Sequence, residues 1–172
     1  MMGAFFEGLW SAVQSISIEG IMDYLRDVNI VSICVRVVLS MICGGVIGIE
    51  RSRAHQVAGM RTYMLVCMGA TVVMLTGQYM HMFFEAGDPA RLGAQVVSGI
   101  GFLGAGGIIS SREKIKGLTT AAGLWASACI GLSIGIGFYS AAIVFTVAVF
   151  LILSKFRKIE RYINAKFYKE DI

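Results

Sequence analysis

Residues 30–49 read IVSICVRVVLSMICGGVIGI, an apolar stretch whose only charged residue is Arg36. A transmembrane helix needs about 20 mostly apolar residues, so this stretch predicts a membrane span. Apolar stretches of similar kind recur at 63–83, 93–110, 118–136 and 138–153. We therefore predict an all-α fold, a polytopic transmembrane helix bundle of about five spans. The last two follow each other so closely that they must form a tight helical hairpin through Gly135, Ile136 and Gly137.

The composition supports lipid as the solvent. Hydrophobic residues make up 56% of the 172 residues and charged residues 15%, whereas a soluble domain carries about 25% charged residues. The cysteines lie inside apolar stretches and form no CxxC pair, which argues against a disulfide framework or a zinc site. We expect no cofactor and no bound metal.

Basic residues are unequally shared between the two sides of the predicted bundle. One side carries only Arg26 and Arg91 in its connecting segments, and the positive-inside rule makes it the outer side. The N-terminus is then outside and the C-terminus cytoplasmic. The cytoplasmic side carries Arg51, Arg53, Arg61, Arg112, Lys114, Lys116, Lys155, Arg157, Lys158, Arg161, Lys166 and Lys169.

This orientation divides the chain into three parts. Residues 1–29 have apolar residues at helical spacing and predict an amphipathic segment on the outer surface. Residues 30–153 form the transmembrane domain. Residues 154–172 alternate apolar and basic residues and predict a cytoplasmic tail that binds anionic lipid, rather than nucleic acid.

The predicted third span contains GIGFLGAGG at 99–107. A dinucleotide-binding loop is rejected because no strand precedes the glycines. Two interpretations stay open: close packing against several helices, or a helix break that lines a cavity. Under either, Gly101 and Gly104 should not accept side chains.

Three charged features are candidates for function. Arg36 is an intramembrane charge, which is either functional or reaches toward Glu85 or Asp88 at the outer surface. Glu50 follows the first span, at the negative end of the helix dipole, and should pair with an arginine, with Arg61 preferred over Arg53. A cytoplasmic anion site is possible where helices begin near basic side chains, the alternative being capping and topology signals. Its candidate residues are Arg61, Arg112, Lys114 and Lys116.

Catalysis and direct Mg²⁺ conduction are both poorly supported by the residue pattern. No predicted span holds Asp or Glu, and His55 and His81 lie at opposite membrane edges. Mg²⁺ requires oxygen ligands, and Arg36 would oppose a cation path, although backbone carbonyls at 99–107 could supply oxygens. The sequence therefore predicts that the protein is not an enzyme.

Four motifs in order resemble the MgtC/SapB family of membrane proteins. They are GGVIGIERSR (44–53), AGMRT (58–62), DPARLGAQVVSGIGFLGAGGII (88–109) and KGLTTAAGLWASACIGL (116–132), within a resemblance that covers about residues 30–153. The chain looks like a short form without the soluble C-terminal domain of some members. The matched candidates are Glu50, Arg51, Gly59, Arg61, Thr62, Gln95, Gly99, Gly101, Phe102, Gly104, Gly106, Gly117, Thr119, Thr120 and Trp125.

The resemblance implies a multi-pass protein of the bacterial cytoplasmic membrane, linked to growth in low magnesium and in some pathogens to virulence. It implies a regulator that contacts other membrane proteins. We also expect a homo-oligomer. The alternative is a small transporter or channel with a path along the glycine-rich third span.

Overall fold

The computed structural model describes residues 18–85, 88–110 and 115–156. Within these ranges the chain is helical apart from a small antiparallel hairpin between β1 (Ile109–Ser110) and β2 (Ile115–Lys116). The predicted helical fold class is confirmed. The helices are α2 (Ile18–Arg26), α3 (Ile30–Arg53), α4 (Met60–Phe84), α5 (Pro89–Gly106), α6 (Leu118–Gly135) and α7 (Tyr139–Leu151), followed by a π-helical turn η1 (Ile152–Phe156).

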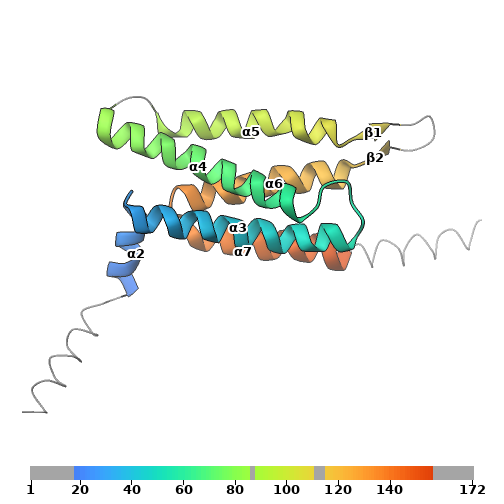
Figure 1. Ribbon diagram of the computed structural model, residues 1–172, viewed down its shortest axis with the longest axis horizontal. Helices are drawn as coiled ribbons and strands as arrows, with labels where there is room; N and C mark the ends of the chain where they lie inside the picture. Colours follow the sequence, from blue (N-terminus) through green and yellow to red (C-terminus); the bar gives the residue numbers. More distant parts are fainter. Residues whose placement is uncertain (1–17, 86–87, 111–114, 157–172) are drawn as a thin grey trace, which may run out of the picture.

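Helices α3 to α7 lie side by side and alternate in direction (Figure 1). Four stretches within the described residues are long and apolar enough to cross a membrane: α3, α4, α6, and α7 continued through η1. Helix α5, the predicted third span, is not among them. It begins at Pro89 rather than residue 93, so it includes Arg91 as well as Gln95, and both lower its mean hydropathy.

Local sequence signals set the helix ends. The Asn29 side chain caps α3 by accepting a hydrogen bond from the backbone N–H of Ser32 at 2.8 Å. Asp88 caps α5 through the N–H of Ala90 at 2.9 Å, and Pro89 occupies the first helical position. Gly137 adopts a φ of 80° in the turn between α6 and α7, which confirms the tight hairpin.

Two glycine pairs bring α3 and α6 into close contact with α4. A Cβ on Gly48 of α3 would lie 2.5 Å from the Met60 Cα, and a Cβ on Gly135 of α6 would lie 2.8 Å from the Thr71 backbone oxygen. Gly44 and Gly131 are equally crowded, by Tyr63 and Cys67 respectively. Both Gly-x-x-x-Gly pairs are therefore helix-packing faces.

The distribution of side chains is that of a membrane protein. Large apolar residues cover the outside of the bundle, including Val38 and Val144, which are 54% and 70% exposed. Several buried side chains are polar. They are Ser32, Arg36, Ser40, Glu50, Arg51, Thr71, Thr120, Ser127 and Thr146.

Parts of three predictions lie outside the described residues. They concern residues 1–17 of the predicted amphipathic segment, residues 157–172 of the predicted basic tail, and Arg112 and Lys114 of the predicted anion site. The described end of the amphipathic segment is α2, which packs Met22 and Leu25 against the core while Asp23 and Tyr24 are exposed.

Candidate functional site

Arg36 is completely buried near the N-terminal end of α3. An arginine side chain has five N–H donors in a planar fork, and in this protein hydrogen bonds engage every nitrogen. Nε donates to the Tyr139 hydroxyl at 3.1 Å. Nη1 donates to Gln78 Oε1 at 2.9 Å and to the Gly135 carbonyl at 2.6 Å. Nη2 donates to the Leu25 carbonyl at 2.8 Å and to the Arg26 carbonyl at 2.7 Å.

The backbone acceptors explain how the charge is tolerated. Leu25 and Arg26 end α2, and Gly135 ends α6, so the negative ends of two helix dipoles face the guanidinium. The predicted reach toward Glu85 or Asp88 is wrong, because the partners are carbonyl, amide and hydroxyl oxygens. Tyr139 also donates to the Leu25 carbonyl at 2.6 Å, which closes the network.

This geometry makes Arg36 a structural tie rather than a binding group. Its five hydrogen bonds match its five donors, so no N–H is left for an external anion. The side chain joins α3 to α2, α4, α6 and α7 at one end of the bundle.

At the opposite end of α3, Glu50 and Arg51 form a buried ion pair. The Arg51 Nη2 also donates to the Leu153 carbonyl in η1 at 2.9 Å. The predicted pairing of Glu50 with an arginine is confirmed, but the choice of Arg61 is wrong, because Arg61 is exposed. Adjacent helical residues do not normally face each other, so spacing alone pointed away from Arg51.

The loop that follows α3 brings further motif residues to this end. Ser52 Oγ accepts a hydrogen bond from the Met60 N–H at 3.0 Å, and a Cβ on Gly59 would lie 2.7 Å from that oxygen. The buried Thr120 hydroxyl donates to Gln56 Oε1 at 3.4 Å. The motif residues Glu50, Arg51, Gly59 and Thr120 are thus brought to the same end of the bundle, where they tie helix ends together.

Gly117 belongs to the same end and has a strict backbone requirement. Its φ of 97° lies in the left-handed region, and a Cβ there would collide with the Gly107 carbonyl oxygen. The turn from β2 into α6 therefore needs glycine.

Other motif residues lie at the surface of the chain. Arg61, Thr62, Thr119 and Trp125 are exposed, as is Lys116. Arg61 and Lys116 are the described residues of the predicted anion site, and the site stays a prediction.

The glycines of α5 divide into two classes. Gly104 is buried and a Cβ there would lie 3.3 Å from the Ala121 Cβ of α6, so the packing prediction holds at this position. It is wrong at Gly101, where a Cβ would meet nothing within 4 Å. Gly99 and Gly106 are equally open. The helix is continuous to Gly106, so the described structure shows no helix break within 99–106.

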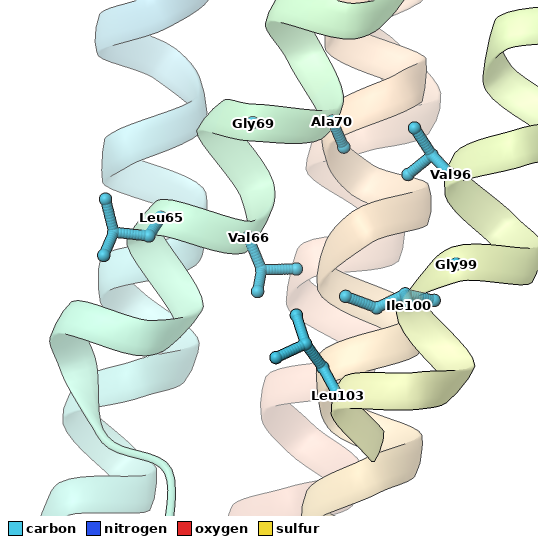
Figure 2. A pocket seen from close by; sticks show the side chains of 8 residues that line it. All are labelled: Leu65, Val66, Gly69, Ala70, Val96, Gly99, Ile100 and Leu103. Atoms are coloured by element: carbon cyan, nitrogen blue, oxygen red, sulfur yellow. The ribbon is translucent and has the colours of Figure 1, made fainter. Parts of the chain in front are cut away.

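An apolar groove separates α4 from α5 (Figure 2). Its volume is about 360 Å³, and Gly69 and Gly99 open it because neither carries a side chain. The lining residues are Leu65, Val66, Gly69, Ala70, Val96, Gly99, Ile100 and Leu103. These side chains offer no oxygen ligand to a cation.

Comparison with known proteins identifies the family of this chain. The family model described as "MgtC family" matches residues 37–162, well over half of the chain. The chain belongs to the MgtC family.

Individual relatives of this MgtC-family chain are known from several bacteria. A protein of Escherichia coli K12 named "Putative magnesium transporter YhiD" is 38% identical over 140 residues, which cover 78% of this chain and 65% of that protein. Proteins named MgtC from Brucella abortus and Salmonella typhimurium LT2 are each 43% identical over 110 residues. Those 110 residues cover 64% of this chain and 45% and 46% of the two proteins. The chain thus spans less than two thirds of the length of these relatives. No solved structure matches.

The MgtC-family motifs did not reveal the residues that hold Arg36. Tyr139 and Gln78 were missed because they lie far from Arg36 in the sequence and outside the quoted motifs. The usable signal was Gln78 itself, a polar amide near the C-terminal end of the apolar helix α4. Among residues 18–85, 88–110 and 115–156, no group of three or more His, Cys, Asp or Glu side chains could hold a metal ion.

Proposed function

We propose that this protein is a five-span protein of the bacterial cytoplasmic membrane that supports magnesium homeostasis by regulating other membrane proteins. In a pathogen the same role would contribute to virulence. The N-terminus lies outside and the C-terminus in the cytoplasm.

The arrangement of the helices supports five spans. Helix α5 packs along α4 and α6, both of which are apolar enough to cross the membrane. At 1.5 Å per residue its 18 residues extend about 27 Å, close to the thickness of the hydrocarbon core. An element of that length packed along two spans lies at their depth. The basic loop after α3 and the strands β1 and β2 then share one end of the bundle (Figure 1).

The burial and complete hydrogen bonding of Arg36 favour regulation of other proteins over ion conduction. A fully buried guanidinium with five internal hydrogen bonds places a permanent positive charge inside the outer end of the bundle. A Mg²⁺ path needs oxygen ligands and negative potential, and Arg36 supplies the opposite. Contacts with other proteins need neither.

A transporter is the second candidate, favoured by the name of the YhiD relative and by the groove along α5. The groove is apolar, so a hydrated ion would find no ligand there. An ion path would need polar groups contributed from elsewhere.

The two candidates are separated by measuring flux and growth with the same protein. Purified protein in liposomes containing a Mg²⁺-sensitive dye should give no more influx than protein-free liposomes, with an ionophore as positive control. The same gene should restore growth of a deletion strain in low magnesium. Protein-dependent Mg²⁺ influx would overturn the regulator in favour of the transporter. Absence of both influx and rescue would overturn the magnesium role.

Orientation is tested independently with reporter fusions at Glu85 and at the C-terminal end. A periplasm-active reporter should work only at Glu85. Activity at the C-terminal end would contradict the proposed topology.

A further inference from the structure

One face of α5 points away from the rest of the bundle. The residues on this face of α5 are spaced alternately four and three positions apart in the sequence, as expected for one face of a helix. All are exposed, and Phe102 is 85% exposed, whereas Gly93, Ile100 and Gly104 on the inner face are buried. We call this face the α5 stripe; it consists of Arg91, Gln95, Ser98, Phe102 and Ala105.

The stripe is unsuited to contact with lipid tails. Gln95 lies six residues beyond Pro89, which places it about 9 Å along the helix, and Ser98 lies about 14 Å along. At the depth of the neighbouring spans, an unpaired amide or hydroxyl costs free energy because no water is available there. Helices α3, α4, α6 and α7 with η1 meet the hydropathy needed for a span and α5 does not, so its exposed polar face requires a protein cover.

We propose that the α5 stripe is a homodimer interface, covered by α5 of a second copy of this chain. A two-fold axis along the membrane normal would set the two α5 helices side by side in the same direction, each presenting the same stripe. The partner must then be chemically complementary to the stripe, and the stripe is complementary to itself.

The stripe is complementary to its own copy at three positions along α5. The exposed Asp88 and Arg91 carry opposite charges three residues apart, so each copy offers the other a cation and an anion. The Gln95 amide is both donor and acceptor and can pair with its own copy. Ser98 and Ala105 are small and lie two turns apart, which lets the two backbones approach closely.

The groove beside α5 can accept the remaining bulky residue. It adjoins the stripe, because its lining residues Gly99 and Leu103 directly follow Ser98 and Phe102. Its volume of about 360 Å³ exceeds the engineered cavity of about 150 Å³ that binds benzene. Phe102 of each copy would place its ring in the groove of the other. A lipid headgroup could pair with Arg91 at the surface but not with the deeper Gln95 and Ser98.

Disulfide cross-linking tests the geometry. In a background with Cys34, Cys43, Cys67 and Cys129 replaced by alanine, Ser98→Cys should form a dimer in native membranes under mild oxidation. The matched control is Val144→Cys, at a position that is 70% exposed. It belongs to α7, a helix on the far side of the bundle from α5 (Figure 1). Cross-linking of Val144→Cys as readily as Ser98→Cys, or of neither, would overturn the interface.

Subunit counting by photobleaching in liposomes over a range of protein-to-lipid ratios tests the energetics. The unmodified chain should dimerise. Gln95→Leu should weaken dimerisation about threefold to tenfold by removing an interhelical amide pair, and Ala105→Trp should weaken it by at least as much. Both side chains are exposed in the single chain, so each variant should fold, as size-exclusion chromatography will check. Val144→Ile should have no effect.

Three outcomes would overturn the proposal. They are a monomeric wild-type chain, a dimer that tolerates both stripe variants, and a monomer whose bound anionic lipid is lost in Arg91→Ala, which would make the stripe a lipid site. The dimer proposal rests on the proposed position of α5 at the depth of the neighbouring spans, and it does not depend on the magnesium role. Flux and growth measurements can therefore fail without affecting it, and the converse also holds.

Discussion

Replacing Arg36 with leucine should destabilise the bundle more than any change of an exposed charge. The substitution removes five hydrogen bonds and leaves three acceptors without this donor: the Arg26 and Gly135 carbonyls and Gln78 Oε1. The Leu25 carbonyl is less affected, because it still accepts from the Tyr139 hydroxyl at 2.6 Å. At about 1 kcal/mol or more for each buried acceptor, the free energy of unfolding should fall by about 3–5 kcal/mol.

The assay is unfolding in mixed micelles of increasing SDS fraction, followed by far-ultraviolet circular dichroism. Arg36→Lys keeps the charge but offers three donors instead of five, so it should lose about 1–2 kcal/mol. The matched control is Arg26→Leu. It removes a cation that is 61% exposed and pairs with Asp23 at 3.5 Å, but it retains the backbone carbonyl that accepts from Arg36. It should change stability by less than about 0.5 kcal/mol.

The result that refutes this account is a loss below about 1 kcal/mol for Arg36→Leu. The network would then contribute little to stability, and a buried charge without a stabilising role would have to be explained by function.

Two further predictions concern packing and the second buried charge. Gly131→Leu should abolish folded protein, because the leucine side chain would collide with the Cys67 carbonyl, whereas Gly69→Leu should be tolerated because nothing lies within 4 Å of its Cβ position. Fluorescence-detected size-exclusion chromatography measures the folded yield of both variants. Equal yields would contradict the packing argument. Glu50→Gln and Arg51→Gln should each lower the free energy of unfolding by about 3 kcal/mol, because each single change removes one partner of the buried ion pair. The double variant should lose less than the sum of the two single losses, and additive losses in a double-mutant cycle would show that the pair is not coupled.

The helical bundle could be predicted from the sequence because span length and apolar composition are local properties. Helix α5 marks where this method fails. Composition placed its start at residue 93, but Asp88 followed by Pro89 is a helix-start signal and would have given the observed boundary. Including Arg91 then shows that α5 differs from the other spans.

The candidate site was harder to predict because its contacts join distant parts of the chain. The depth of Arg36 followed from its position in the first span, but Tyr139 lies 103 residues away and carries no pattern that marks it as a partner. For Gly101 and Gly104, composition could not tell which one faces a neighbour. That distinction depends on the rotation of α5 against Ala121 of α6.

The two buried arginines of α3 fix opposite ends of the bundle by the same chemistry. They are 15 residues apart, about 22 Å along the helix, and each donates to backbone carbonyls where another helix ends: Arg36 to Gly135 of α6, and Arg51 to Leu153 in η1. The hydrogen bonds of both arginines therefore stabilise the packing of the helices. Among the described residues, the α5 stripe and the exposed side chains at the Arg51 end of the bundle take no part in these ties. We expect variants that alter function without unfolding the protein to lie there.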